Sequence, residues 1–480
     1  MGKKYIGRAE ETRLILQYLQ TDRSELVALY GRRRVGKTYL IRCILEKKID
    51  FEFTGMYHTS GSIQRIQFQK ELAKLTGQEK ESPRDWFNAF DNLREYLLSL
   101  HKEQVVVFLD EIPWIDTTGA HFLSAFSQFW NSWGREQVKL KLFVCGSATT
   151  WMTDKFIGDR GGLYGRVSRA IYLAPFTLSE TEEYLNDMKK MNYDRQQVLD
   201  TYMILGGIPY YLDMLYPAYP LSVNIDKLFF SKNAPLKSEY EFLFRSLFKN
   251  NSKYRQVVEL LSSKMTGMTR EEITEEIGVT GGELSRILNN LRLCDFIQSY
   301  IEPGKIERGK IYQLTDMFCL FYLRFVQNHG GQDEQYWSNN RHSGKTKAWS
   351  GYAFEQVCLH HIPQIKQALG ISGILSNHYA WHSKPYTDKD GNTWKGGQID
   401  LIIDRDDHVM NLCEMKYSQE EFIIDKDYAE TIRERTQLFR RQQKTTKNLR
   451  CTFITVYGVK QNKYSGIVDH QLTLDDLFRI

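Results

Sequence analysis

The residues with the clearest capacity for chemistry lie near the N-terminus, in the run "LVALYGRRRVGKTYLIRCIL". An apolar stretch typical of a β-strand is followed by the spacing GxxxxGK(S/T), and then by an amphipathic stretch typical of a helix. Glycines let the backbone wrap around phosphate groups, and the first N–H groups of a helix are unpaired donors for an anion. We therefore predict a phosphate-binding loop formed by Gly31, Arg32, Arg33, Arg34, Val35, Gly36, Lys37 and Thr38.

Two acidic residues follow another apolar strand in "VVVFLDEI", residues 105–112. Lys37 is expected to reach the β- and γ-phosphates of ATP, while Thr38 and Asp110 bind Mg²⁺. Glu111 is then suitably placed to polarise the attacking water as a general base. An acidic pair after a strand is usually a turn, but downstream of a phosphate-binding loop it predicts ATP hydrolysis.

Two weaker elements would complete this site. In "KLFVCGSATTWM", Ser147 follows a third apolar strand, where it would contact the γ-phosphate or water, or would simply cap the strand end. "DRGGLYGRVSR" offers Arg160, Arg166 and Arg169. An arginine stabilises the charge that develops in phosphoryl transfer, although surface arginines are the commoner case. We select Arg166, acting within its own chain or in a neighbouring subunit of a homo-oligomer.

A second group of carboxylates lies near the C-terminus, in "GGQIDLIIDRDDHVMNLCEMKYS". Glu414 and Lys416 are two residues apart on a strand and so share a face, while Asp400 stands at the start of another apolar run. Two carboxylates on adjacent strand ends could bind Mg²⁺ or Mn²⁺, and Lys416 could orient or help deprotonate a water. The alternative is a Glu–Lys ion pair on an ordinary solvated sheet edge.

The elements that position these residues fall into regions. Alternating helical patterns and strand-like runs over 1–175 predict a parallel sheet covered by helices, in a multidomain α/β protein. Residues 176–250 read as a mainly helical lid, and 251–326 as three helices followed by strand, turn and strand. A polar stretch at 327–348 is the best linker candidate, and 349–480 form a second α/β unit.

The N-terminal half resembles the archaeal-type ATPases within the AAA+/STAND group of P-loop NTPases. The resemblance rests on "GRRRVGKT", "FLDEIPW", "GSATTWM", "LYGR" and "GGIPYYL", which together span most of residues 1–215. In that group a GxP element in the helical lid lies near the adenine, so the resemblance implies that Pro209 contacts the nucleotide. The alternative is that Pro209 only separates two lid helices.

The middle region, from "MTREEITEEIGVTGGELSRIL" to "KIYQLTD", resembles a winged helix-turn-helix, which places its second helix in the major groove of DNA. The exposed face of its second helix, 281–294, carries only Arg286 and Arg292 as basic side chains, and further basic groups are Lys305, Arg308 and Lys310. The last three fall in the wing, so phosphate contacts are better supported than base readout. A spacer or oligomerisation domain of the same fold is the alternative.

The C-terminal unit resembles the PD-(D/E)xK nuclease superfamily, as found C-terminal to this type of ATPase. The matching positions are Asp400, Glu414, Lys416 and, in the preceding helix "GYAFEQVCLHHI", Glu355. The resemblance implies a restriction-endonuclease-like α/β fold, in which Glu355 is an added metal ligand or a hydrogen-bonding partner. The proline that usually precedes the first acidic residue is absent before Asp400.

Composition limits the remaining possibilities. With 42% hydrophobic and 26% charged residues the chain is globular, and it has no apolar run long enough for a transmembrane helix and no signal-peptide core. Seven scattered cysteines without a CxxC pair indicate reduced thiols and a cytoplasmic protein. The net charge of +5 permits nucleic-acid binding without arguing for it.

Together these features predict an ATPase that binds and hydrolyses ATP with Mg²⁺ and acts on, or is regulated by, nucleic acid, with DNA favoured. A metal-dependent nuclease-like domain would follow it. The alternative is an ATP-dependent signalling switch or DNA-binding regulator whose nuclease-like domain only binds. A homo-oligomer or a partner protein is compatible with either function, and no membrane is expected.

Overall fold

The structure is a computed structural model that describes residues 5–136, 139–158, 161–248, 250–301, 309–387, 391 and 393–479. The chain forms two compact units, Met1–Pro175 and Phe176–Ile480. The first unit therefore ends at the residue where the predicted ATPase core ends. Among the described residues, no helix combines the length and the apolar character needed to cross a membrane.

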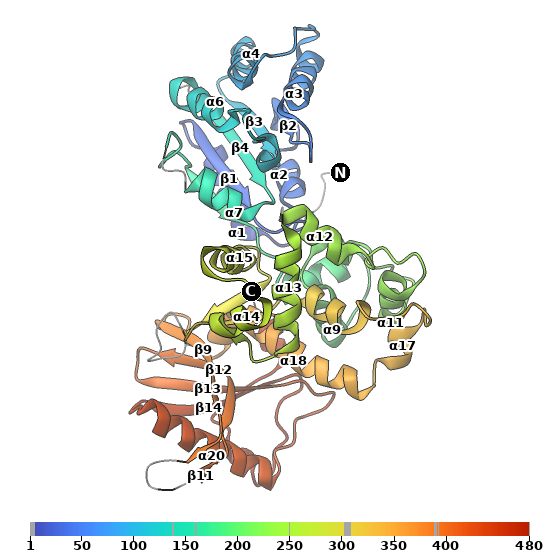
Figure 1. Cartoon of the computed structure of the whole chain (residues 1–480), viewed down its shortest axis with the longest axis vertical. Helices are drawn as coiled ribbons and strands as arrows, with labels where there is room; N and C mark the ends of the chain where they lie inside the picture. Colours follow the sequence, from blue (N-terminus) through green and yellow to red (C-terminus); the bar gives the residue numbers. More distant parts are fainter. Residues whose placement is uncertain are drawn as a thin grey trace. The chain divides into compact units, whose positions relative to one another are not determined.

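The first unit is built on a five-stranded parallel sheet in the order β2-β3-β4-β1-β5 (Figure 1). Its strands are β1 (Glu25–Tyr30), β2 (Phe51–Thr54), β3 (Val105–Asp110), β4 (Leu140–Gly146) and β5 (Arg169–Tyr172). The central strands β1, β3 and β4 are almost entirely buried, as expected for strands covered by helices on both faces. Their continuous apolar runs were the sequence signal for this sheet.

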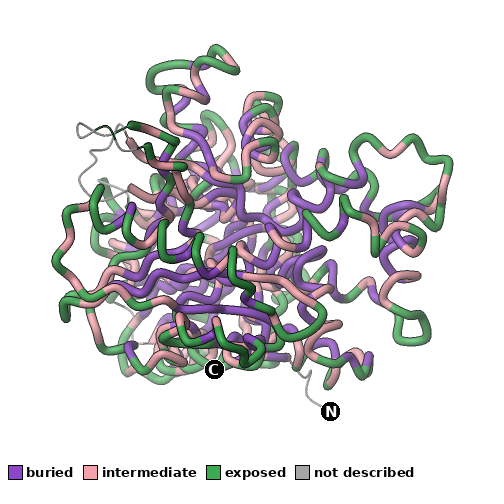
Figure 2. The backbone as a smooth tube through the Cα atoms, turned by 90° about the horizontal axis from the view of Figure 1, so that it is seen from below, coloured by how far each residue is buried: buried purple, intermediate pink, exposed green. Residues whose placement is uncertain are grey.

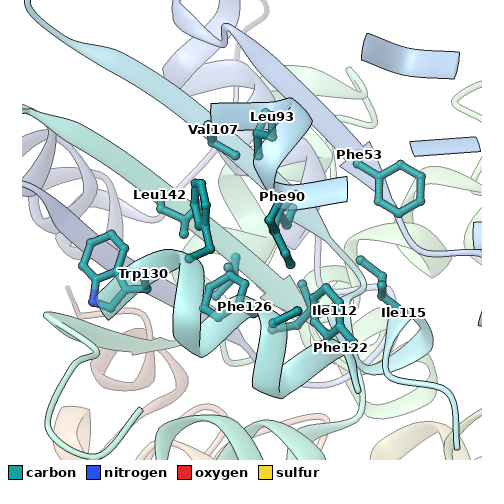
Figure 3. Packing of buried hydrophobic residues seen from close by; sticks show 14 of the residues in the cluster. Phe53, Phe90, Leu93, Val107, Ile112, Ile115, Phe122, Phe126, Trp130 and Leu142 are labelled. Atoms are coloured by element: carbon teal, nitrogen blue, oxygen red, sulfur yellow. The ribbon is translucent and has the colours of Figure 1, made fainter. Parts of the chain in front are cut away.

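Helices enclose the sheet: α1 (Ala9–Leu19), α2 (Lys37–Leu45), α3 (Gly61–Thr76), α4 (Trp86–Ser99), α5 (Ile112–Ile115), α6 (Phe122–Phe129) and α7 (Thr149–Trp151). Figure 3 shows the core on one face, where Phe90 and Phe126 from the helices meet Val107 and Leu142 from the sheet. Phe90 and Phe129 stack with ring centroids 5.1 Å apart. This aromatic packing fixes the strands whose ends carry the predicted nucleotide residues.

The second unit begins with helices, as predicted for 176–250: α8 (Leu178–Glu183), α9 (Arg195–Leu205), α10 (Pro209–Asp213), α11 (Leu221–Ile225) and α12 (Glu239–Leu247). The next segment comprises α13 (Asn251–Ser263), β6 (Met268–Thr269), α14 (Arg270–Ile277), α15 (Gly281–Leu293), β7 (Ile297–Tyr300) and β8 (Ile311–Leu314). The three strands pair antiparallel in the order β6-β8-β7. Lys305 and Arg308 lie outside the described residues.

The polar stretch predicted to be a linker is packed within the second unit. It contains α17 (Tyr336–Asn340), whose Trp337 is buried and lies edge-on to Phe321 and Trp349. The carboxylate of Asp226 accepts a hydrogen bond of 2.7 Å from the Trp337 N–H. A few aromatic anchors therefore hold a segment whose average composition is that of a tether.

The C-terminal part contains a mixed sheet in the order β15-β14-β13-β12-β9. Its strands are β9 (Ser376–Ser383), β12 (Gly397–Arg405), β13 (Val409–Lys416), β14 (Asn448–Thr455) and β15 (His470–Leu472). Strands β9, β12 and β13 pair antiparallel, whereas β13, β14 and β15 pair parallel. Helix α18 (Gly344–His360) precedes the sheet, and α20 (Lys426–Gln443) connects β13 to β14. In Figure 2 buried backbone fills the interior, while exposed residues mark outer loops and turns.

Candidate functional site

The predicted phosphate-binding loop lies between β1 and α2. Gly31 and Gly36 have φ angles of 144° and 92°, a region that favours glycine. At Gly31 a Cβ atom would lie 2.4 Å from the carbonyl oxygen of Leu173, so a larger residue would displace the neighbouring chain. Arg34 also adopts a positive φ, 74°, in the same loop. The backbone thus wraps in a tight curve before α2 begins at Lys37.

The structure brings Thr38 together with Asp110 from β3. The Thr38 hydroxyl donates a hydrogen bond of 2.9 Å to the Asp110 carboxylate. The Lys37 ammonium lies across the loop and donates to the carbonyl oxygens of Gly31 and Arg32, at 2.9 and 2.8 Å. Hydroxyl and carboxylate oxygens are the ligands that Mg²⁺ prefers, so this pair fits the predicted metal.

Glu111 and Ser147 form a second contact at the same sheet edge. The Glu111 carboxylate accepts hydrogen bonds from the Ser147 N–H and hydroxyl, at 3.0 and 2.7 Å. Glu111 has a positive φ of 48°, which is uncommon for a residue other than glycine. Burial, with a contribution from the neighbouring Glu111 charge, raises the pKa of Asp110 to about 6. The two hydrogen bonds from Ser147 thus orient Glu111, the predicted general base.

The loop arginines have distinct surroundings. Arg32 is buried, as is Val35, whereas Arg33 is partly exposed and its guanidinium lies 5.6 Å from the centre of the Trp114 ring. These contacts hold the outer turn of the loop against the protein. The sequence pattern predicted the loop and could not separate these roles.

Three further predicted residues come from other segments of the chain, and the structure describes two of them. Arg166 is partly buried after a turn at Gly165, where its N–H donates to the Leu163 carbonyl. Arg160 lies outside the described residues. Pro209 is the first residue of α10 in the second unit, a position that suits its fixed φ. The catalytic role of Arg166 and the nucleotide contact of Pro209 stay predictions.

The C-terminal carboxylates meet around a lysine. Asp400 on β12 and Glu414 on β13 stand on adjacent antiparallel strands. The Lys416 ammonium lies 3.7 Å from the Asp400 carboxylate and 3.5 Å from that of Glu414. The two carboxylates together raise the pKa of Lys416, overcoming the opposing effect of its burial. The side chains that the motif predicted are therefore assembled around one positive charge.

Helix α20 adds two residues that the sequence reading missed. The Arg435 guanidinium pairs with one oxygen of Glu414 at 2.6 Å, and the Tyr428 hydroxyl donates to the other at 3.0 Å. Glu414 is 4% exposed and Arg435 15%, so the pair is largely removed from water. Tyr428 and Arg435 are seven residues apart and so lie on one face of the helix. In the sequence, that spacing was the only indication that the two side chains act together.

Glu355 on α18 completes the surroundings. Burial, together with the Asp400 charge, raises the pKa of Glu355 to about 8. Both residues line a small cavity of about 30 Å³, large enough for a water molecule or two, with Gln356, Trp381 and Tyr300 also in its wall. The amide of Gln356 is buried and makes no hydrogen bond within the described structure.

The donor set suits a hard divalent cation only in part. Asp400 and Glu414 already share a cationic group, and Mg²⁺ commonly uses one or two carboxylates plus substrate phosphates. Within the described ranges, however, no three His, Cys, Asp or Glu side chains are close enough to hold a metal. The third ligand role predicted for Glu355 therefore stays a prediction.

Comparison with known proteins gives a partial match. Residues 5–215 match a family described as an ATPase domain predominantly from Archaea. The chain is 24% identical over 358 residues to the uncharacterized protein MJECL04 of Methanocaldococcus jannaschii, covering 74% of this chain and 76% of that protein. A 44-residue match, 43% identical, to the uncharacterized ATP-binding protein MJ0423 of the same organism covers 9% of this chain and 75% of the relative.

Solved structures show more distant similarity. A Walker-type ATPase of Pyrococcus abyssi is 18% identical, with 67% of this chain and 96% of that chain covered and a TM-score of 0.49. The ORC2 protein of Aeropyrum pernix, in ADPNP–ADP complexes, is 13% identical, with 67% and 95% covered and a TM-score of 0.43.

The family match and the site geometry coincide. The matched range contains the whole "GRRRVGKT" loop and the Asp110–Glu111 pair at the end of β3. Residues 5–215 are therefore similar to an archaeal P-loop ATPase domain. The matched family is the archaeal one that the motifs had indicated, and its range extends beyond the first unit to include α9 and α10.

Proposed function

We propose that the chain is an ATP-regulated enzyme acting on DNA. ATP would be hydrolysed in the first unit, DNA contacted by residues 251–326, and phosphodiester bonds cleaved by residues 349–480. The observation that carries the cleavage step is the convergence of Asp400 and Glu414 on the Lys416 ammonium, at 3.7 and 3.5 Å. Such a constellation on adjacent strands suits a metal-assisted attack of water on a phosphate ester.

In the ATPase domain each side chain has a defined task. The loop N–H groups and Lys37 bind the phosphates, and Lys37 exchanges its contacts with loop carbonyls for contacts with phosphate oxygens. Thr38 and Asp110 would hold Mg²⁺, which when bound neutralises charge on the β- and γ-phosphates. Glu111 accepts a proton from the attacking water or orients it, while Ser147 keeps the Glu111 carboxylate in place.

The order of elements supports a winged helix in the middle region. Helix α14 begins with a capping box between Thr269 and Glu272, ends at Gly278 with a φ of 67°, and is followed by α15 and the antiparallel strands β7 and β8. Arg286 and Arg292 are exposed on α15. With so few basic groups, contacts to phosphates would position DNA without reading its sequence.

The order α18, β9, β12, β13, α20, β14 supports the nuclease-like assignment, because it places the carboxylates on neighbouring strands with a helix on each side in sequence. Asp400 and Glu414 would hold Mg²⁺ or Mn²⁺, whose chemistry is to polarise the phosphate and acidify water. Lys416 then holds the attacking water. Arg435 and Tyr428 fix the Glu414 carboxylate.

A cleavage assay tests this proposal. We expect the full chain with Mg²⁺ or Mn²⁺ to cleave single-stranded, double-stranded or branched DNA, and Asp400→Asn to abolish cleavage. Asp406→Asn is the matched control, since Asp406 is exposed at the end of the same strand segment and should be dispensable. Intact DNA with wild-type protein across these substrates and metals would refute the cleavage role.

One observation favours a second function, an ATP-dependent switch whose C-terminal domain only binds. Both oxygens of Glu414 are already engaged, one by Arg435 and the other by Tyr428. If these contacts persist in solution, Glu414 is a structural carboxylate. Calorimetry of nucleotide-free protein with Mn²⁺ separates the two functions: binding heat that is lost in Glu414→Gln supports the nuclease, whereas no heat in either protein supports the switch.

A further inference from the structure

A polar cluster joins the lid helix α9 to the residue that directly follows Lys416. The Tyr417 hydroxyl donates a hydrogen bond of 2.9 Å to the Asp200 carboxylate, and the Gln196 amide donates to both the Tyr417 oxygen and Asp200, each at 2.9 Å. Asp200 and Gln196 are one helical turn apart and share a face of α9. All three residues are partly exposed, and burial of the Asp200 carboxylate raises its pKa to about 6. These bonds serve no step of the proposed chemistry.

The opposite end of α9 contacts the first residue of the second unit. The Phe176 N–H donates a hydrogen bond of 2.6 Å to the carbonyl of Gly207, just beyond the helix end. A Cβ atom at Gly207 would lie 2.0 Å from the Phe176 carbonyl oxygen, so the two backbones are in direct contact. A shift of Phe176 must therefore move the end of α9.

On the other side of the unit boundary, the chain contacts the phosphate-binding loop. The Leu173 N–H donates a hydrogen bond of 2.7 Å to the Tyr30 carbonyl at the end of β1. Its carbonyl oxygen packs against Gly31, the first residue of the loop. Only Ala174 and Pro175 separate Leu173 from Phe176. A rearrangement of the loop around phosphates therefore has a short covalent route into the second unit.

Helix α9 is suited to carry that displacement as a rigid element. It packs along α18, and the two helices are neighbours in Figure 1. The Tyr202 ring lies 5.5 Å from that of His361, at the end of α18. The buried His361 ring accepts a hydrogen bond from the Leu178 N–H at 2.9 Å and donates to the Val357 carbonyl at 2.7 Å. The lid helices α8 and α9 therefore contact the end of α18, and α9 also contacts Tyr417, directly after β13.

We propose that α9 couples the nucleotide state of the phosphate-binding loop to the C-terminal site, and that Tyr417 and Asp200 are positioning residues that set the placement of Lys416. The regulatory meaning rests on the proposed function, since it requires an ATP site and a working Lys416. The coupling passes from Gly31 through Leu173 and Phe176 to α9, and from Asp200 to Tyr417. The step from α9 to Tyr417 consists of hydrogen bonds to the Tyr417 hydroxyl. Removing that one oxygen therefore breaks the step.

The test compares wild type with Tyr417→Phe, which removes only that hydroxyl. Hydrogen exchange is measured over α9 and over residues 412–417 of the full chain with Mg²⁺ and either ADP or a non-hydrolysable ATP analogue. In wild type we expect the exchange rates of both segments to differ at least about fivefold between the two nucleotides. In Tyr417→Phe the difference should persist in α9 and vanish at 412–417. Tyr464→Phe, remote from α9 in sequence and bonded to other residues of its own turn, should behave as wild type.

A conservative replacement distinguishes a positioning role from a general loss of structure. Asp200→Asn keeps an acceptor for the Tyr417 hydroxyl and should retain the response at 412–417, whereas Asp200→Ala should lose it. If wild type shows no nucleotide-dependent exchange in α9, or if Tyr417→Phe keeps the full response at 412–417, the coupling is refuted.

Failure of the coupling is distinguishable from failure of the proposed function. DNA cleavage that is equally fast with both nucleotides in wild type and Tyr417→Phe would refute the coupling and leave the nuclease standing. Conversely, a nucleotide response at 412–417 that depends on the Tyr417 hydroxyl supports the coupling even when no DNA is cleaved, since the exchange measurement does not use DNA.

Discussion

Replacing the largely buried Arg435 by methionine should destabilise the C-terminal sheet more than replacing an exposed arginine of the same helix. Arg435 pairs with the buried Glu414 at 2.6 Å and also donates to the Gln398 carbonyl at 2.9 Å. Removing one partner of a buried ion pair costs about 3–5 kcal/mol, because the remaining charge is left without compensation. Lys416, 3.5 Å from Glu414, keeps part of that compensation, so we expect about 3 kcal/mol.

The measurement must report on this sheet separately from the ATPase unit. Native-state hydrogen exchange in increasing urea follows β12 and β13 directly and gives their free energy of opening. A loss of about 3 kcal/mol corresponds to roughly a hundredfold higher opening equilibrium. Arg433→Met is the matched control, because Arg433 is exposed on the same helix and should change stability by no more than about 0.5 kcal/mol.

A double variant tests the physical reason. Because most of the cost comes from the uncompensated carboxylate, Arg435→Met combined with Glu414→Gln should recover at least about half of the lost stability. If Arg435→Met costs less than about 1 kcal/mol, Glu414 is not held as a buried charge in solution. If the double variant is as unstable as the sum of the single variants, the two side chains do not interact.

Three further outcomes follow from other parts of the molecule. Lys37→Ala should abolish nucleotide binding in a fluorescent-analogue titration and turnover in a phosphate-release assay; unchanged hydrolysis would refute the site. Glu111→Gln should keep binding and lower turnover by about 10²–10⁴-fold, with a smaller loss in Ser147→Ala; equal turnover in all three proteins would exclude Glu111 as the base. Burial lowers the pKa of His361 to about 4, below the unfolded value near 6.5, so its contribution to stability is present above pH 6.5 and is lost as pH falls toward 4, by about 3 kcal/mol. Urea unfolding of His361→Gln should therefore depend less on pH over that window than wild type, and parallel curves would contradict the assignment.

The ATPase unit was predictable because its signals are local. A glycine pattern between a strand and a helix specifies the loop, and apolar runs of the right length specify the parallel strands β1, β3 and β4. Asp110 could be placed opposite Thr38 because carboxyl ends of neighbouring parallel strands meet at one edge of a sheet. What the pattern could not give was the Ser147–Glu111 bond, since a polar residue after a strand caps it as often as it contacts a neighbour.

The C-terminal site was predictable only along one strand. The spacing of Glu414 and Lys416 puts both on one face, and that inference needs no tertiary structure. Arg435 and Tyr428 lie on a helix beyond the strand, amid many other charged residues, and nothing in the sequence says which of them turns inward. The polar 327–348 stretch shows the same limit, since Trp337 packs against aromatic partners that its polar neighbours do not reveal.

The two candidate functions make opposite demands on the same pair of contacts. A metal ligand must offer an oxygen, whereas Glu414 has both oxygens bound to α20. A nuclease is favoured when one of these contacts opens as metal and phosphate arrive, because the freed lone pair can then bind the metal. Because Tyr417 bonds the end of that strand to α9, movement of the lid is a route by which ATP could favour the open arrangement. A switch without cleavage needs the same route, but it keeps both Glu414 contacts with α20. Mn²⁺ binding measured with ADP and with the ATP analogue distinguishes the nuclease from the switch. If Mn²⁺ affinity rises with the analogue in wild type, and not in Tyr417→Phe, a metal site must open.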